Sequence, residues 1–512
     1  MLSALIWIPL VGAILIALYP GKLNSIHCRL LAIVIASIPF IINIVLGFNF
    51  DPTNPNIQFT EYVPWIKKIG LNYHLGVDGL SYPLIFLNSL LTLISIYASS
   101  QTIKRSRFYY ILILILNSGV MGALIAQDVL LFFLFFELEI IPLYFLIGIW
   151  GGAKRGYASM KFLLYTTVSG ILILTSFLGL VWLSKSYNFD YEALRTHTLP
   201  LSTQLILLTP LVIGLGIKIP IFPFHTWLPD AHVQASTPIS VLLAGILLKL
   251  GTYGLLRFGI GLFVDAWVFI APWLATLAAI SVLYGASCAI LQKDMKRVIA
   301  YSSIAHMGYI LLAAAAATRL SITAATFQMV SHGLISSLLF LLVGVVYKKT
   351  GSRDVDFLQG LLNPQRGLPI TGSLMVLAVM ASMGIPGMAG FIAEFLVFRG
   401  SFSIFPIQTL LCLIGSGLTA VYFSLMVNRV FFGRLTSELA QLPRVLWTER
   451  IPAFILSFCI LVLGLQPSWM IRWNETQAGF LLKGKPDIAV VMQQWQMERQ
   501  WKKKIETFRV ID

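Results

Sequence analysis

Residues 203–225 read TQLILLTPLVIGLGIKIPIFPFH, an apolar run that could cross a membrane but contains a lysine, Lys218. A helix needs about 20 residues to span a hydrocarbon core of ~30 Å. Pro220 and Pro223 follow the lysine, and proline removes a backbone donor and kinks or breaks a helix. We therefore predict a membrane helix that is interrupted at depth, with a charged side chain at the interruption.

The same combination recurs in a second apolar segment, residues 368–400. Residues 384–390 read GIPGMAG and precede an acid within the same apolar run, Glu394. Paired broken helices predict an inverted repeat with polar sites at the breaks. The two segments are the seventh and twelfth spans of the chain, so the expected repeats are helices four to eight and nine to thirteen.

The composition of the whole chain indicates an all-α polytopic membrane protein. It has 512 residues, of which 58% are hydrophobic and 11% charged, whereas soluble domains have about 25% charged residues. Hydropathy predicts about fourteen transmembrane helices. The expected spans are 2–20, 29–48, 80–99, 108–126, 128–149, 160–183, 203–225, 233–258, 267–290, 298–317, 322–346, 368–400, 405–431 and 451–466. The first is apolar from the outset, which predicts an uncleaved helix rather than a signal peptide.

Four parts follow from this division of the chain. They are the first three helices with a long lumenal loop (1–107), the first repeat (108–258), the second repeat (267–431), and the last helix with a basic tail (432–512).

The net charge of +15 bears on orientation rather than on nucleic acid, because Lys and Arg are dispersed through short loops. The odd-numbered loops carry most of them, which predicts that these loops are cytoplasmic and that both termini are lumenal or periplasmic. The basic tail, residues 483–512, opposes this rule. We expect the tail to lie on a membrane surface or on a partner subunit.

Four ionisable residues lie in the middle of predicted spans: Glu137, Lys218, Lys249 and Glu394. Such residues are costly in a membrane and mark ion or proton pathways. Lys249 lies eight residues before Arg257, or roughly 12 Å from that helix end, which is too far for its stem to snorkel. We predict that Glu137 and Lys218 form a switching ion pair; the alternative is a static salt bridge.

Several further residues are candidates for accessory roles. Glu139 is roughly 200° around the helix from Glu137, so its role is open between a functional and a structural contact. His306 and His332 lie in predicted spans and could relay protons or simply bond backbone carbonyls. His225 and His232 bracket a connection that they shape or through which protons gain access.

Redox, nucleotide and metal chemistry are not expected in this chain. Its four cysteines are widely separated and match no disulfide, zinc or iron–sulfur spacing. It has no dinucleotide-binding glycine motif, no Walker lysine loop and no nucleophile elbow. The histidines near Asp230 lack a convincing metal-ligand set. Charge movement must therefore be driven by a partner or by another ion gradient.

These motifs resemble a known family, the antiporter-like membrane subunits of complex I and the related Mrp-type cation/proton antiporters. The similarity covers about residues 75–430. The residues that carry it are Phe136-Glu137 with Pro142, the stretch Lys218–His232, Lys249 in its Gly-Ile-Leu-Leu-Lys context, Asp294–Arg297, Ala300–Ser303 and His306. The resemblance implies fourteen helices with two inverted repeats. It also implies that protons pass by Glu137, Lys218, Lys249, His306 and Glu394.

Finer features resemble the chain 4 type of cyanobacterial and chloroplast NAD(P)H-quinone oxidoreductases. These features are Glu394, the Glu-Leu-Glu of residues 137–139, and Trp150–Arg155. The resemblance implies a thylakoid membrane, sister antiporter-like partners, and iron–sulfur clusters and plastoquinone held by other subunits. Phe136 replaces an expected tryptophan, which is compatible with a paralogue in a complex for carbon dioxide uptake that has a carbonic-anhydrase-like companion.

Two other functions remain open from the sequence. One is a sodium/proton antiporter subunit driven by an ion gradient, and the other is a membrane scaffold with frozen ion pairs.

Overall fold

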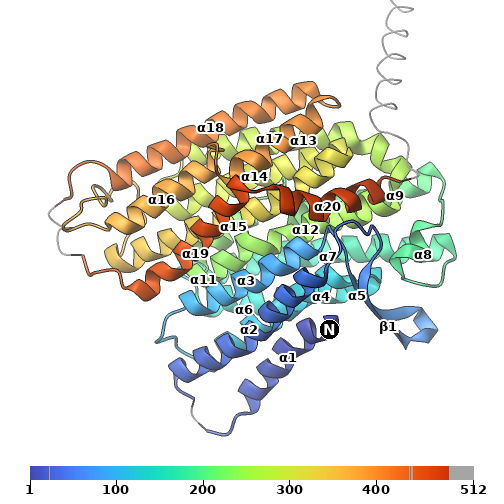
Figure 1. Cartoon of the computed structure of the whole chain (residues 1–512), viewed down its shortest axis with the longest axis horizontal. Helices are drawn as coiled ribbons and strands as arrows, with labels where there is room; N and C mark the ends of the chain where they lie inside the picture. Colours follow the sequence, from blue (N-terminus) through green and yellow to red (C-terminus); the bar gives the residue numbers. More distant parts are fainter. Residues whose placement is uncertain (22, 437–438, 440–441, 484–512) are drawn as a thin grey trace, which may run out of the picture.

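The structure is a computed structural model that describes residues 1–21, 23–436, 439 and 442–483. Most of this chain is helical, and the long helices run roughly along the long axis of the molecule (Figure 1). The first eight helices are α1 (Leu2–Leu18), α2 (Ser25–Asn49), α3 (Tyr82–Ala98), α4 (Ser106–Ile125), α5 (Val129–Leu138), α6 (Ile140–Trp150), α7 (Arg155–Ser184) and α8 (Tyr191–Arg195). The next seven are α9 (Leu201–Lys218), α10 (Trp227–Gln234), α11 (Thr237–Leu242), α12 (Leu248–Gly254), α13 (Val264–Ile290), α14 (Met295–Ala316) and α15 (Arg319–Thr350). The remaining five are α16 (Pro369–Ser382), α17 (Ala389–Phe402), α18 (Pro406–Phe431), α19 (Trp447–Leu465) and α20 (Ser468–Leu481).

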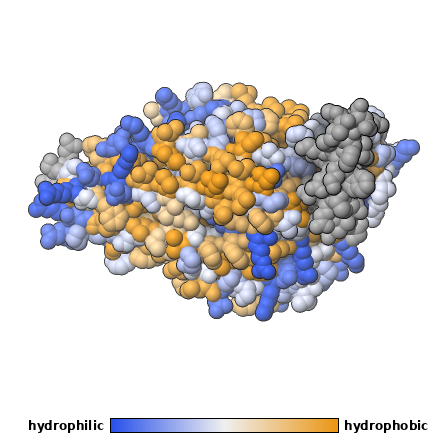
Figure 2. Space-filling model, turned by 90° about the horizontal axis from the view of Figure 1, so that it is seen from above, coloured by the Kyte–Doolittle hydropathy of each residue, from blue (hydrophilic) through white to orange (hydrophobic). Residues whose placement is uncertain are grey.

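The length and composition of these helices are those of a membrane protein. Within the described residues, eleven helical segments are long and apolar enough to cross a membrane, and α1, α3 and α16 are shorter apolar helices. Hydrophobic residues gather over the middle of the face shown in Figure 2. Backbone groups in a hydrocarbon core must be satisfied within the segment, which a helix achieves.

Both interruptions predicted from proline and glycine are present. Helix α9 ends at Lys218, and the chain becomes helical again at Trp227. Helix α16 ends at Ser382, and α17 begins at Ala389. Between α16 and α17 the backbone turns through Gly384 and Gly387, whose φ values of 73° and 90° favour glycine.

Two further irregularities were not predicted. Glu139 separates α5 from α6, so the predicted span 128–149 consists of two helices. In the span that contains Lys249, π-helical segments at 243–247 and 255–260 flank α12 on both sides. Single π-helical turns within α-helices are frequent at functional sites.

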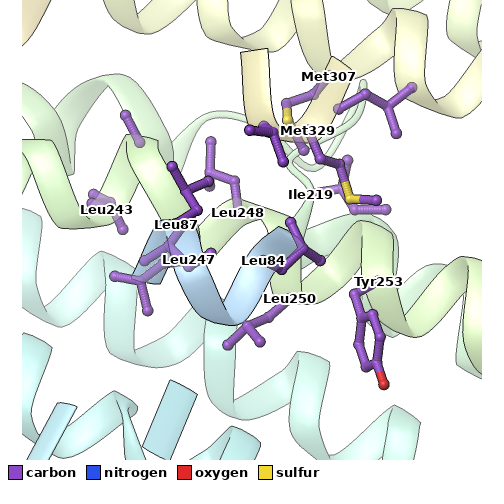
Figure 3. Close-up of a cluster of buried hydrophobic side chains, with 14 of the residues drawn as sticks. Leu84, Leu87, Ile219, Leu243, Leu247, Leu248, Leu250, Tyr253, Met307 and Met329 are labelled. Carbon is purple, nitrogen blue, oxygen red and sulfur yellow. The ribbon is translucent and has the colours of Figure 1, made fainter. Parts of the chain in front are cut away.

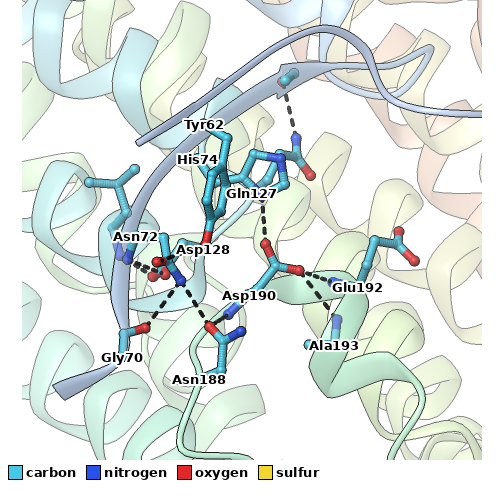
Figure 4. A network of polar contacts seen from close by, with 12 residues as sticks. Tyr62, Gly70, Asn72, His74, Gln127, Asp128, Asn188, Asp190, Glu192 and Ala193 are labelled. Atoms are coloured by element: carbon cyan, nitrogen blue, oxygen red, sulfur yellow. Dashed lines mark hydrogen bonds and ion pairs between the residues drawn. The ribbon is translucent and has the colours of Figure 1, made fainter. Parts of the chain in front are cut away.

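The predicted loop 49–79 contains a two-stranded antiparallel hairpin of β1 (Gln58–Ile66) and β2 (Leu71–Val77). Its register pairs Gln58 with Val77 and Val63 with Tyr73. Figure 4 shows how polar contacts fasten β2 to the helices: His74 Nδ1 lies 2.5 Å from Asp190 Oδ2, and the Asn72 N–H donates to Asp128.

The connections gather at the two ends of the helices. At the end that we call the basic end (residues 99–105, 151–154 and 291–294), the Trp150 indole donates to the Lys104 carbonyl at 2.7 Å. At the other end, which we call the hairpin end (residues 50–81, 126–128 and 185–200), the N-terminal amine pairs with Glu61, and Arg195 donates to the Phe480 carbonyl of α20. The expectation for the basic tail falls on residues 484–512, which lie outside the described residues.

Candidate functional site

Lys218, the last residue of α9, is buried in an ion pair with Glu139. The side chains of Lys218 and Glu139 are 2% and 0% exposed. The Phe136 ring lies beside the ammonium, with 4.9 Å between Nζ and the ring centroid. Residues three apart lie on one helical face, so Phe136 and Glu139 present a single surface of the α5–α6 segment to Lys218.

In the structure the carboxylate that contacts Lys218 belongs to Glu139. The predicted partner, Glu137, interacts with Lys218 electrostatically without contacting it, and the switching of that pair stays a prediction. Glu137 does lie on another face, as its angular separation from Glu139 predicts. Its carboxylate packs against Gly170 of α7, where a β-carbon would clash with Oε1. The Lys218 charge still interacts with Glu137 electrostatically, so the two carboxylates and one ammonium form a single charge cluster.

Lys249 belongs to a second buried cluster. Its side chain is completely buried in α12, and its ammonium donates to the Ala244 carbonyl in the adjoining π-helical segment. Lys249 Nζ lies 2.9 Å from Nδ1 of His332, which belongs to α15. A buried ammonium next to an imidazole is an arrangement in which a proton can be exchanged.

The second cluster continues through two histidines to Glu394. The rings of His332 and His306 are 5.4 Å apart between centroids. His306 Nδ1 lies 3.6 Å from Glu394 Oε1, and the Ser416 hydroxyl donates to Glu394 Oε2 at 2.6 Å. Lys249, His332, His306 and Glu394 thus form a buried series of titratable groups that connects α12, α15, α14 and α17.

A small cavity lies within this series. Its volume is about 10 Å³, and its lining includes His306, Gln328, His332, Ser382 and Glu394. That volume is comparable to the smallest space that can hold one water molecule. The lining supplies several donors and acceptors, so one water could bridge the histidines and Glu394.

No hydrogen bond or ion pair within the described residues joins the Lys218 cluster to the Lys249 cluster. Helices α9 and α12 pack directly there, with Gly251 against Ile219 and the Leu215 carbonyl. Figure 3 shows the apolar side chains of this region, among them Ile219, Leu248 and Met329. The residues by which protons were expected to pass are therefore divided into two clusters by an apolar layer.

His225 and His232 lie outside both clusters. The His225 ring is 4.7 Å from the Tyr284 ring, and the His232 ring stacks on Phe340 at 4.4 Å. Their ring nitrogens have no hydrogen-bond partner among the described residues. These contacts agree with a role in shaping the chain after the α9 break.

Lys296 is a buried charge that sequence reasoning assigned to a loop. Its Nζ lies 2.7 Å from the Ala235 carbonyl and 3.2 Å from the Ser240 hydroxyl, so it ties α14 to the end of α10 and to α11. The sequence signal that could have indicated its burial is the position of Lys296 directly before an apolar run.

Arg257 was expected at a solvated helix end, but the structure buries it. It is 1% exposed and pairs with Asp78 at the hairpin end, where it also donates to Gln127. The error arose because Asp78 lies 179 residues away in the sequence.

Comparisons with known proteins agree with this architecture. The family model described as NADH:quinone oxidoreductase/Mrp antiporter, TM matches residues 126–419. NAD(P)H-quinone oxidoreductase chain 4 1 of Nostoc sp. is 40% identical over 487 residues, which cover 93% of this chain and 90% of that protein. Chain 4-2 of Synechocystis sp. is 41% identical over 440 residues, covering 84% of this chain and 78% of that protein.

Solved structures give the same result. A chain of respiratory complex I from Thermus thermophilus with bound NADH superimposes with a TM-score of 0.84 at 26% identity, covering 94% of this chain and all of that chain. A chain of the Mrp complex from Dietzia sp. has the same fold, with a TM-score of 0.84 at 20% identity and coverage of 96% and 99%. The chain belongs to the transmembrane subunit family shared by NADH:quinone oxidoreductases and Mrp antiporters.

Proposed function

We propose that this chain is a proton-translocating membrane subunit of a complex I-like NAD(P)H- or ferredoxin:plastoquinone oxidoreductase. Its cyanobacterial relatives are named NAD(P)H-quinone oxidoreductase chain 4. Quinone reduction in other subunits, which hold the iron–sulfur clusters and the quinone, would drive proton movement through this chain. The partners would be the other membrane-arm subunits, including sister antiporter-like chains.

One observation supports this proposal above the others: the buried series Lys249–His332–His306–Glu394. Each member can gain or lose a proton, and neighbouring members lie close enough for transfer directly or through one water. A scaffold with frozen ion pairs does not require four titratable groups in succession. It requires pairs such as Arg257 with Asp78.

The proposed direction of transfer follows from the position of the clusters. Protonation changes in Glu137, Glu139 and Lys218 would alter the charge next to α12. Lys249 would then exchange its proton with His332, and His306 would pass it to Glu394 for release. The apolar layer between the clusters would have to admit water during turnover. The entry of water into this layer would therefore be the step that controls proton transfer.

The finer arrangement is part of the same proposal. It comprises fourteen spans, two inverted repeats at 108–258 and 267–431, flanking parts at 1–107 and 432–512, lumenal termini and a thylakoid location. The separation of the basic end from the hairpin end supports this orientation, because the N-terminus and α20 lie at the less basic end. A carbon dioxide uptake complex with a carbonic-anhydrase-like companion remains one form of this enzyme.

A sodium/proton antiporter subunit is the second candidate, because the family model spans both groups of proteins and the Mrp chain shares the fold. A tagged form of the chain, isolated with its partners, distinguishes the two. Iron–sulfur subunits in the isolated complex support the oxidoreductase, whereas only small membrane proteins support the antiporter. The proton yield per electron should fall in a Glu137→Gln variant, and an undiminished yield would contradict a role of this residue in transfer.

A further inference from the structure

A solvent-accessible pocket of about 540 Å³ lies at the basic end, away from both proton clusters. Its lining consists of Lys104, Arg105, Gly148, Ile149, Trp150 and Arg155. The pocket thus lies where α6 ends and where α4 and α7 begin. Its volume is in the range of small-molecule binding sites.

The charge of this pocket is positive and uncompensated. Lys104, Arg105 and Arg155 form no ion pair with any described carboxylate. Helices α4 and α7 both begin here, and neither has an acidic residue in its first turn or a side-chain cap. The positive ends of two helix dipoles therefore add to three cationic side chains.

The walls of the pocket are held in place. The Trp150 indole N–H donates to the Lys104 carbonyl at 2.7 Å. The Arg155 guanidinium donates to the Ile149 carbonyl at 2.9 Å. These bonds fasten the loop before α4 and the start of α7 to the end of α6. The basic side chains are therefore already held together before a ligand binds.

An apolar strip leads from the pocket along α6. Ile141, Phe145 and Ile149 are spaced by four residues and lie on one helical face. Ile141 and Phe145 are 63% and 37% exposed, and Phe108 of α4 packs against Phe145. In a bilayer this strip faces the acyl chains, while Trp150 lies at the level typical of interfacial aromatic residues.

We propose that this pocket binds the headgroup of an anionic phospholipid, with an acyl chain along the α6 strip. A phosphodiester would receive hydrogen bonds from Arg105, Arg155 and Lys104, and basic pockets between membrane helices are suited to such headgroups. A free phosphate would satisfy the cations but would leave the apolar strip unused. The lipid would act as a bound component that fixes α4, α6 and α7 relative to one another.

The test uses the full-length chain in a mild detergent and counts bound lipids by native mass spectrometry during titration with dioleoyl phosphatidylglycerol. Arg105→Gln/Arg155→Gln removes two cations. Arg366→Gln is the matched control, because that arginine is exposed at the same end and forms no ion pair with a described residue. With roughly fivefold tighter binding contributed by each basic residue, we expect about 30-fold weaker binding of the first lipid in the double variant. The control should bind as the wild type does.

Three results would overturn the proposal. Equal affinity in the wild type and the double variant would place the lipid elsewhere. Displacement of the lipid by millimolar inorganic phosphate would indicate a site for a free anion. Equally tight binding of dioleoyl phosphatidylcholine would indicate that only the apolar strip matters. Arg105→Lys/Arg155→Lys retains the charge and should retain most of the affinity, which separates loss of charge from misfolding.

Discussion

Replacing Glu139 by Gln tests which carboxylate holds Lys218. The substitution keeps the shape of the side chain and removes its charge, so it leaves a buried ammonium without its contacting partner. Glu137→Gln is the matched variant, because it removes an equal charge two residues away without touching the ion pair.

The magnitude follows from the burial of both partners. Breaking a buried ion pair by removing one partner costs about 3–5 kcal/mol. The amide carbonyl that replaces the carboxylate of Glu139 can still accept a hydrogen bond, and the Phe136 ring still faces the ammonium, so we expect the lower end, about 3 kcal/mol. Glu137→Gln should cost less than Glu139→Gln, because the Glu137 carboxylate interacts with Lys218 over a longer distance and does not contact it.

The assay is unfolding of the purified chain by increasing mole fractions of SDS, followed by tryptophan fluorescence. A double-mutant cycle with Lys218→Met isolates the pair, because the variant lacking both charges should regain most of the lost stability. A coupling energy near zero between positions 139 and 218, together with a large one between 137 and 218, would refute the assignment.

Three further predictions concern other parts of the fold. Gly390→Ala should prevent normal packing of α17, since a β-carbon there would clash with the Ala381 carbonyl, and the variant should show reduced assembly on native gels. The Asp128 side chain caps α5 by accepting hydrogen bonds from two backbone N–H groups. Asp128→Ala removes this cap and should lower the free energy of unfolding in SDS titrations by about 1–2 kcal/mol. Burial opposes ionisation of Asp190, but hydrogen bonds from His74 and from backbone donors outweigh burial and lower the pKa of Asp190 below the usual 3.8. The stability that ionised Asp190 contributes should therefore be lost only as the pH falls below 3.8. Hydrogen exchange in β2 should then increase in the wild type and not in Asp190→Asn; a pH-independent wild type would contradict this.

Much of the fold could be predicted from local sequence. Apolar runs, prolines and glycines were sufficient to place the breaks after Lys218 and Ser382, because these signals act on the backbone where they occur. Lys218, Lys249 and Glu394 are buried at 1%, 0% and 4% exposure, as their positions within apolar runs predicted.

The contacts between these residues could not be predicted in the same way. The choice between Glu137 and Glu139 depends on how the α5–α6 segment is rotated against α9, which local sequence does not determine. The pairing of Lys249 with His332 and of Arg257 with Asp78 likewise joins residues far apart in the chain. The hairpin was expected only as part of a long loop, because its strands are fastened by distant residues such as Asp190.

The central claim is that Lys249 carries protons rather than merely filling a buried position. It is tested most directly by the proton yield per electron in closed membrane vesicles that contain the assembled complex with Lys249→Met, with Lys293→Met as the exposed lysine control. We predict that the Lys249 variant transfers fewer protons per electron than the wild type, while the control is unchanged. An undiminished yield in an intact Lys249→Met complex would contradict the account.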